Sequence, residues 1–317
     1  MKNLEQSPPP TPQTLPTIVQ VKSLRPAIVG QFIAVVLIWS LTPLAAVFTV
    51  KEIHWAWGLF LRFSLALVFA LPIIYLFKIT IPWHKQACIS YLAGALGLFG
   101  SMTLCYIGAQ YVPSALISMI YGFAPILSGL FGILLLKHKA FGLTQYCGLL
   151  LATLGMGLAL GLGSARVHFN LVGIGFEFSA VLLYVCSALW VSKFSEGIHP
   201  IAQMTGATLF SWIGYIVLLP LFKNDIPMWQ NLSLSAYGAV IYSALFSSVL
   251  AMICYYSLIH NIKTSTLMLI TIITPVLATV WGIWLNNELL STSFFIGLVF
   301  TCVGLFIYLS QSQPSST

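Results

Sequence analysis

The chain has 317 residues, of which 59% are hydrophobic and only 6% are charged, with a net charge of +7 and a mean hydropathy of +0.98. Soluble domains carry about 25% charged residues. The composition therefore excludes a water-soluble globular enzyme, a disordered chain, a fibre and a disulfide scaffold. The 13 Lys and Arg residues are scattered in short loops and form no basic run, which argues against a nucleic-acid partner.

Residues 1–26 contain a Ser-Pro-Pro-Pro-Thr-Pro run without apolar periodicity, which predicts a disordered tail. Ten apolar segments follow, and about 20 helical residues suffice to cross a bilayer. Only helices satisfy the backbone of such segments in lipid, so the sequence predicts an all-α integral membrane protein with a short tail at residues 311–317. The segments are 27–50, 53–76, 87–109, 112–136, 141–163, 171–192, 200–222, 235–259, 264–286 and 291–310.

The positions of the Lys and Arg residues predict the orientation of the helices. With the N-terminus in the cytoplasm, nine of these residues fall on the cytoplasmic side, three fall on the outer side and Arg62 lies inside a segment. Because cytoplasmic loops carry an excess of Lys and Arg, we expect both termini of this multi-pass chain to be cytoplasmic, in a bacterial inner membrane.

An internal repeat appears when the chain is shifted by 150 residues. The matched pairs are Tyr106 with Tyr256, Gln110 with His260, Tyr121 with Thr271, Pro125 with Pro275, and Gly132 with Gly282. The repeat unit is five helices, an odd number, so the two copies cross the membrane in opposite directions. Such an inverted repeat, predicted here at 27–163 and 171–310, is typical of secondary transporters.

Polar and small residues recur at helical spacing in the fourth and ninth segments, where Ser128 and Thr271 lie close to Pro125 and Pro275. Small residues at this spacing favour close helix packing. A proline also frees a backbone carbonyl within the membrane, where it can bend the helix or meet a polar substrate. Both interpretations stay open, and they apply equally to Pro43 in the first segment.

Two charged residues lie within the segments. Arg62 is nine residues into the second segment, about 14 Å deep at the rise of an α-helix, and Glu177 is six residues into the sixth, about 9 Å deep. A charge at the membrane centre costs about 2.5–3.5 kcal/mol, so each needs a partner or a wet cavity. Arg62 is either a structural anchor or a substrate contact. Glu177 is either a structural acid, protonated or paired with Arg62, or a carboxylate that couples transport to a proton or binds a cation.

No pattern in the chain indicates a cofactor or a metal. The six histidines form no metal-binding pair, and nucleotide-binding loops and nucleophile elbows are absent from the sequence. The six cysteines fall in or beside apolar runs without a Cys-x-x-Cys pair, which favours buried, reduced packing residues.

Three sequence motifs together resemble the EamA family of the drug/metabolite transporter superfamily. They are Trp39-Ser40-Leu41-Thr42-Pro43, then Arg62-Phe63 with Pro72, and Pro275-Val276-Leu277-Ala278 with Gly282 and Glu288-Leu289-Leu290-Ser291. Pro125 and Gly132 match the first-half copy of the third motif, but His138 stands where that copy has glutamate. Asn287 stands where glycine is usual.

The resemblance implies ten helices around a central cavity and a substrate site in that cavity. Carried over residue by residue, the expected substrate-binding residues are Trp39, Ser40, Tyr106, Gln110, Tyr121, Ser128, Tyr184, Tyr256, His260 and Thr271. Arg62 matches the family arginine, Glu177 is the candidate coupling charge, and Glu288 is expected to cap or fix a loop.

The sequence therefore predicts a secondary active carrier without a cofactor. It would move an amino acid, a nucleoside-like or a drug-like compound by alternating access, as an exporter that can be coupled to protons. The alternatives are a passive pore or scaffold, and a membrane-embedded lipid enzyme. The enzyme would need paired acids or a nucleophile beside a base, which the sequence does not offer at helical spacing. The oligomeric state stays open.

Overall fold

The computed structural model describes residues 26–136, 142–160, 170–195, 197–262 and 264–310. In this part of the chain, nine helices are long and apolar enough to cross a membrane, and α7 (Leu143–Ala159) is a shorter apolar helix. The predicted ten crossings are confirmed. The α-helices are α1 Pro26–Val50, α2 Trp55–Leu76, α3 Lys85–Ala95, α4 Met102–Gly108, α5 Ser114–Tyr121, α6 Ala124–Leu136, α7 Leu143–Ala159, α8 Leu171–Phe194, α9 Pro200–Leu218, α10 Leu234–Tyr242, α11 Ala251–Asn261, α12 Thr264–Asn286 and α13 Thr292–Ser310.

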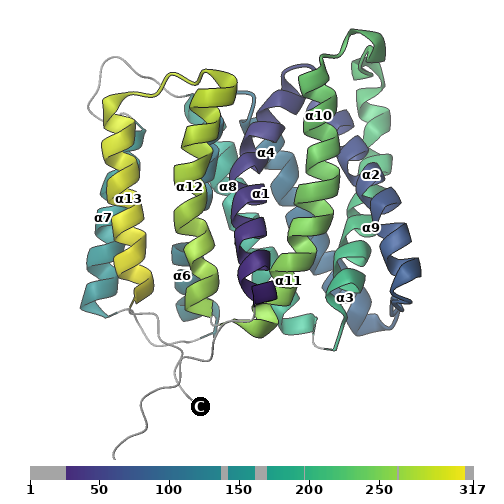
Figure 1. The fold of residues 1–317 in the computed structure, drawn as a ribbon, viewed down its shortest axis with the longest axis horizontal. Coiled ribbons are helices and arrows are strands. Elements are labelled where there is room, and N and C mark those ends of the chain that lie inside the picture. Colours follow the sequence, from purple (N-terminus) through teal and green to yellow (C-terminus); the bar gives the residue numbers. More distant parts are fainter. Residues whose placement is uncertain (1–25, 137–141, 161–169, 196, 263, 311–317) are drawn as a thin grey trace, which may run out of the picture.

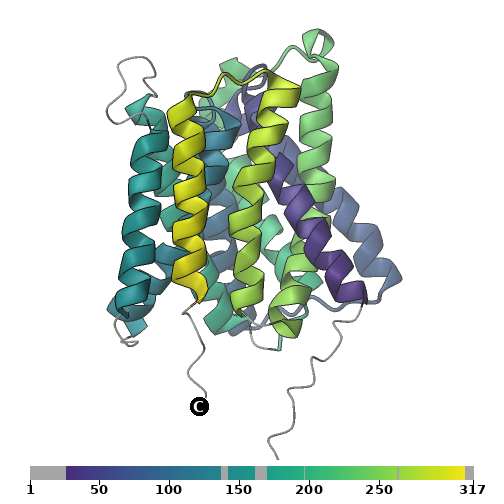
Figure 2. The same cartoon turned by 60° about the vertical axis from the view of Figure 1, so that its left-hand side comes forward.

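The helices stand side by side, and the first residue of α1 and the last residue of α13 lie at the same end of the bundle (Figures 1 and 2). We call this the terminal end, and the other the opposite end. Helices of the two repeats interleave, since α7 packs on α13, α1 on α12, and α3 on α9. Each repeat therefore completes its core only with the other.

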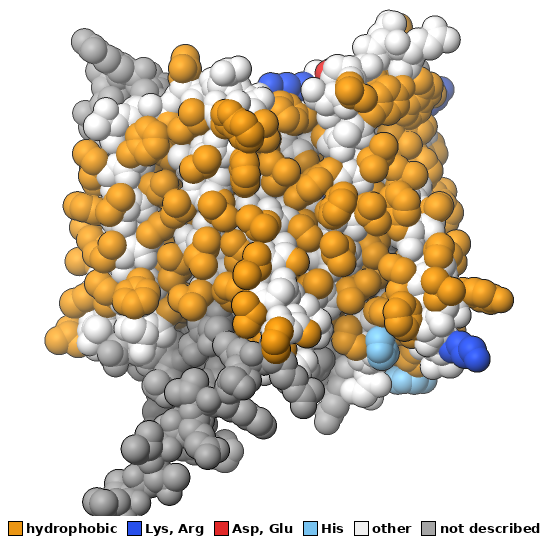
Figure 3. All heavy atoms as spheres, viewed as in Figure 1, with side chains coloured by type: hydrophobic (Ala, Val, Ile, Leu, Met, Phe, Trp, Pro, Cys, Tyr) orange, Lys and Arg blue, Asp and Glu red, His pale blue; other side chains and the backbone are white. Residues whose placement is uncertain are grey.

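The outside of the bundle is apolar. Figure 3 shows hydrophobic side chains over the viewed face, with charged groups near its two rims. Leu71, Val217 and Phe306 are 62%, 73% and 59% exposed. A surface of this kind exceeds any apolar patch that a soluble monomer leaves in water, and it fits a lipid-facing belt.

The third and eighth crossings each contain a π-helical segment. η1 (Leu96–Ser101) joins α3 to α4, and η4 (Ser243–Leu250) joins α10 to α11. Because the two segments have the same rank in the two repeats, the internal repeat extends to this backbone irregularity. π-helical turns are rare and frequently occur at functional sites.

Of the three prolines predicted to bend a helix, one interrupts its helix and two do not. At Pro125 the fourth crossing is broken, because α5 ends at Tyr121 and α6 begins at Ala124. At Pro43 and Pro275 the helices α1 and α12 continue without interruption.

Two polar side chains hydrogen-bond to a backbone carbonyl close to Pro43. The carbonyl of Ile38 accepts hydrogen bonds from Thr42 Oγ1 at 2.8 Å and from Tyr242 OH at 2.9 Å. Pro43 itself removes the helical N–H donor of the next carbonyl, that of Trp39.

Helices α7 and α13 cross with their backbones in contact, at four glycines. A Cβ atom on Gly148 would lie 2.6 Å from the Tyr308 nitrogen, and one on Gly155 would lie 2.5 Å from the Thr301 nitrogen. Gly297 and Gly304 face the same contact from α13. Any side chain at these positions must therefore push the two helices apart.

We expect Gly304→Ala to destabilise the protein by about 1–3 kcal/mol, because its Cβ would meet the backbone of Gly148 at 2.6 Å. Thermal unfolding of the purified protein measures the change. Gly238→Ala in α10 is the control, since no atom lies within 4 Å of its added Cβ. There we expect no loss of stability, or a gain of up to about 1 kcal/mol. Equal midpoints for both variants would contradict the close crossing.

Candidate functional site

Arg62 lies inside the bundle and joins the two repeats. Its side chain is only 4% exposed. Its Nε donates a hydrogen bond to Ser248 Oγ at 2.9 Å. Its Nη1 donates to Tyr106 OH at 3.2 Å and to Met102 Sδ at 3.8 Å. Ser248 belongs to η4, and Met102 and Tyr106 belong to α4 directly after η1. Arg62 thus connects the two π-helical crossings. Because α2 begins at Trp55, Arg62 lies about 10 Å from the start of this helix. It is therefore nearer the opposite end of the bundle than the depth of about 14 Å predicted from the sequence.

One nitrogen of this guanidinium makes no hydrogen bond within the described part of the chain. Among the described residues, Nη2 of Arg62 makes no hydrogen bond, and it is not one of the fully buried unpaired atoms. It therefore retains some accessible surface within the bundle. The predicted alternatives of anchor and substrate contact both stay open for Arg62.

Glu177 of α8 is completely buried, at 0% exposure. Neither of its carboxyl oxygens accepts a well-aligned hydrogen bond from the described residues, and the Cys105 thiol, a weak donor, is the side chain that interacts with them. The carboxyl group fits against Gly108 of α4, where an added Cβ would lie 2.5 Å from Oε1, and the Cys105 thiol lies beside it. The absence of a side chain at Gly108 makes room for the acid. An ionised carboxylate in such a place is costly, so it requires a bound proton or cation.

Arg62 and Glu177 do not pair. In the part of the chain that the structure describes, no ion pair joins them, and they meet α4 through different residues. Arg62 bonds Tyr106, whereas Glu177 lies against Gly108. The predicted alternative in which Arg62 neutralises Glu177 is therefore wrong for this conformation.

A row of aromatic rings begins at Tyr121, whose hydroxyl lies near the Cys105 thiol and the Glu177 carboxyl group; we call it the aromatic row. Tyr121 OH lies 3.1 Å from Ser101 Oγ, and its ring centroid lies 5.9 Å from that of Tyr184. The Tyr184 hydroxyl interacts with Tyr255. Tyr255 contacts Trp39 at 4.8 Å and Tyr256 at 5.9 Å, centroid to centroid. The row comprises Trp39, Tyr121, Tyr184, Tyr255 and Tyr256, all only half-buried.

The structure therefore brings together four of the expected substrate-binding residues, on α1, α5, α8 and α11. They are Trp39, Tyr121, Tyr184 and Tyr256. Tyr255 was missed by the sequence reasoning, although its place next to Tyr256 in a Tyr-Tyr pair was a usable signal.

The other expected residues have different surroundings. Ser40 is fully buried and bonded, since Oγ donates to the Leu37 carbonyl and accepts from Trp281 Nε1 at 3.0 Å. Gln110 is exposed in the turn after α4, outside the aromatic row. Ser128 and Thr271 are half-buried on α6 and α12. His260 lies in the last turn of α11, and its side chain is outside the described residues, as is all of His138.

Glu288 caps α5 from the loop after α12. Its Oε1 accepts from the Ser114 backbone nitrogen at 2.8 Å and from Ser114 Oγ at 2.7 Å, and Oε2 accepts from the Ala115 nitrogen at 3.2 Å. A carboxylate stabilises the start of a helix by filling its free N–H groups and by complementing its dipole. The expected capping role of Glu288 agrees with this geometry, which ties the second repeat to the first.

Two neighbours of Glu288 explain the sequence around it. A Cβ on Gly282 would collide with the carboxylate, so only glycine leaves it room. Asn287 has a φ of +50°, in the left-handed region that glycine adopts freely and asparagine tolerates. The departure from the usual glycine at this position therefore keeps the same backbone conformation.

We expect Glu288→Ala to destabilise the folded protein by about 0.5–2 kcal/mol, because α5 loses its cap. Thermal unfolding of the purified variant measures this. Glu52→Ala is the comparison variant, because it removes a carboxylate at the start of a different helix. Its carboxylate caps α10 instead, through Ser233, so the two losses should add in the double variant. A Glu288→Ala protein as stable as the parent would show that the cap contributes nothing.

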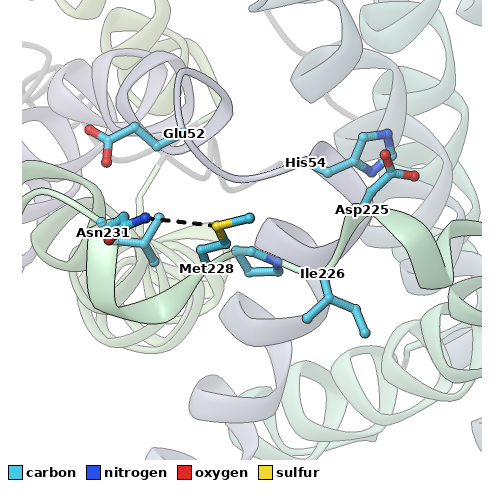
Figure 4. A pocket seen from close by; sticks show the side chains of 8 residues that line it. Glu52, His54, Asp225, Ile226, Met228 and Asn231 are labelled. Carbon is cyan, nitrogen blue, oxygen red and sulfur yellow. Dashed lines mark hydrogen bonds between the residues drawn. The ribbon is translucent and has the colours of Figure 1, made fainter.

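Glu52 borders a hollow of about 420 Å³ at the opposite end, between the loop after α1 and residues 225–232 (Figure 4). Hydrogen bonds from Ser233 lower the pKa of Glu52. Burial lowers the pKa of His54, an effect that the nearby Asp225 opposes. In Figure 4 the Glu52 side chain is turned away from His54 and Asp225. This hollow is separate from the buried acid and the aromatic row.

Comparison with known proteins gives the family. The EamA-like transporter family matches the chain twice, over residues 27–161 and 171–310. The protein PagO of Salmonella typhimurium is 24% identical over 88% of this chain and 91% of its own length. The uncharacterized transporter YdfC of Bacillus subtilis is 26% identical over 74% of this chain and 76% of its own.

A further relative and a solved structure agree with this. The uncharacterized transporter YyaM of Bacillus subtilis is 24% identical over 62% of this chain, and the match spans 65% of YyaM. A solved crystal structure superposes with a TM-score of 0.65 at 16% identity, covering 89% of this chain and 97% of the other, which shows a shared fold. With ten membrane crossings in two five-helix repeats, the chain is a multi-pass membrane transporter and belongs to the EamA-like transporter family.

Proposed function

We propose that the protein is a proton-coupled secondary carrier that exports a small metabolite across the bacterial inner membrane, with both termini in the cytoplasm. The single observation that carries the coupling is the buried Glu177 carboxyl group, which has no cation beside it and no stronger partner than the Cys105 thiol in the described chain. A proton is the smallest ligand that makes such a group neutral. The acid binds it in one conformation and releases it in another.

The aromatic row supports a substrate site next to this acid. Its half-buried rings and hydroxyls suit a compound with both apolar and polar parts, such as an amino acid, a nucleoside-like or a drug-like molecule. We place substrate contacts on Trp39, Tyr121, Tyr184 and Tyr256.

Alternating access requires the contacts between the repeats, 27–163 and 171–310, to rearrange around this site. The broken fourth crossing at Pro125 and the π-helical segments η1 and η4 are backbone irregularities at which such a rearrangement can occur.

The test uses proteoliposomes that contain the purified protein and a bacterial metabolite extract. Mass spectrometry follows the loss of each compound with and without an imposed pH gradient. We expect saturable loss of a few related compounds, faster with the gradient. Loss that does not saturate would indicate a pore. No loss in either orientation, with folding confirmed, would overturn the carrier proposal.

A further inference from the structure

A second hollow, of about 430 Å³, opens on the side of the bundle between α3, η1, α8 and α9. We call it the lateral groove; its lining is apolar and includes Ile89, Leu92, Phe99, Gly100, Trp190 and Phe194. Leu92 and Trp190 are 54% and 55% exposed, on the part of the surface that faces lipid. The volume lies in the range of small-molecule pockets, about 300–1,000 Å³.

The length and depth of the groove match one half of a bilayer. From Ile89 to Gly100 the lining spans 12 residues, and the 11 helical rises between them amount to about 16 Å. Half of a hydrocarbon core of about 30 Å is nearly the same length. The groove starts one turn into α3, and α3 begins at the terminal end. It therefore lies within the leaflet at the terminal end.

Two lysines stand at the mouth of the groove. Lys85 is four residues before Ile89, on the same face of α3. Lys193 precedes Phe194 at the end of α8, with Nζ 5.6 Å from the centre of that ring. Both lysines are exposed, and the one contact of an ammonium group found for either of them in the described part of the chain is that of Lys193 with the Phe194 ring. The apolar groove thus has two exposed ammonium groups at the level of the lipid headgroups.

We propose that the lateral groove binds one acyl chain of an anionic phospholipid, whose phosphate is bound by Lys85 and Lys193. The apolar walls provide contacts for the chain, and the lysines provide the preference for a negative headgroup. Each lysine near a membrane surface strengthens binding to anionic lipid, so the pair predicts a preference of roughly 30-fold over a zwitterionic lipid. The occupied groove lies along η1, directly before the α4 residues that contact Arg62 and Glu177.

Trp190 provides the signal for a test, because bromine atoms on an acyl chain quench tryptophan on contact. The full-length protein is reconstituted in phosphatidylcholine vesicles with a small fraction of brominated phosphatidylglycerol. Parallel vesicles hold the same fraction of brominated phosphatidylcholine. We expect stronger quenching by the brominated phosphatidylglycerol. The chain has nine tryptophans, and Trp190→Phe should remove this excess.

The charges are tested with Lys85→Gln/Lys193→Gln, which should abolish the excess quenching. The matched control, Lys78→Gln/Lys223→Gln, removes two other exposed lysines and should keep it. Equal quenching by the two brominated lipids would overturn the proposal, because it would mark an ordinary lipid-facing surface or one covered by a second copy of the chain. An excess that survives Trp190→Phe would place the preference elsewhere and would overturn it as well.

Discussion

Glu177→Gln is expected to leave the carrier able to exchange its substrate while removing the response of transport to an imposed pH gradient. Glutamine has nearly the shape of the protonated acid but cannot release a proton. The ratio of initial rates with and without the gradient should fall from well above unity to unity. The measurement is initial efflux from proteoliposomes of parent and variant at matched protein density. A variant that keeps the parent's gradient dependence would remove Glu177 as the coupling group.

A second variant tests the same site without touching the acid. The Cβ of Gly108→Ala would lie 2.5 Å from Oε1 of Glu177, so the carboxyl group must leave its position. We expect gradient dependence to be weakened in Gly108→Ala as it is in Glu177→Gln. Gly175→Ala, two residues from Glu177 on α8, is the matched control, because nothing lies within 4 Å of its added Cβ. Gradient dependence should persist in that control. Loss of dependence in Gly175→Ala alone would contradict the assignment.

The sequence predicted the membrane helices well because their signal is physical and local. Apolar run lengths follow from bilayer thickness, and nearly all predicted segments begin and end within two or three residues of the helices observed. The same local signal does not reveal the π-helical segments η1 and η4. In η1 the Phe99 carbonyl accepts a hydrogen bond from Tyr215 OH of α9 at 3.1 Å, a contact between distant parts of the chain that local apolar patterns do not encode. Nor does it show that glycines of α7 and α13 meet, since that depends on which helices become neighbours.

The candidate site was predictable in composition but not in its pairings. The cost of burying charge singled out Arg62 and Glu177 from the sequence alone. It could not show that α4 presents Tyr106 to one and Gly108 to the other, which keeps them apart. Residues matched by the repeat also differ in environment. Tyr106 is fully buried and accepts a hydrogen bond from Arg62, whereas its match Tyr256 is half-buried in the aromatic row, because the two repeats occupy unlike surroundings once they interleave.

Arg62→Ala is expected to lower the yield of folded protein far more than it changes substrate affinity. The substitution deletes two hydrogen bonds from a charged donor, to Ser248 Oγ at 2.9 Å and Tyr106 OH at 3.2 Å, each worth about 1.5–3 kcal/mol. The loss should be at least about 3 kcal/mol, a large part of the stability of a typical protein. Size-exclusion chromatography and thermal unfolding give the folded fraction, and transport by the surviving protein gives the apparent KM.

Ser248→Ala and Tyr106→Phe each remove one of these bonds and leave the guanidinium in place. If Arg62 is an anchor, each should cost less than Arg62→Ala, and neither should change the apparent KM. The alternative role of Arg62 is direct contact with the substrate. Its Nη2 makes no hydrogen bond in the described part of the chain and is therefore the nitrogen that a substrate could bind. A normal yield of Arg62→Ala together with a raised KM would assign Arg62 to substrate binding. In that case the same nitrogen would favour substrates that carry an anionic group, since guanidinium N–H groups form strong charge-assisted hydrogen bonds with carboxylates and phosphates.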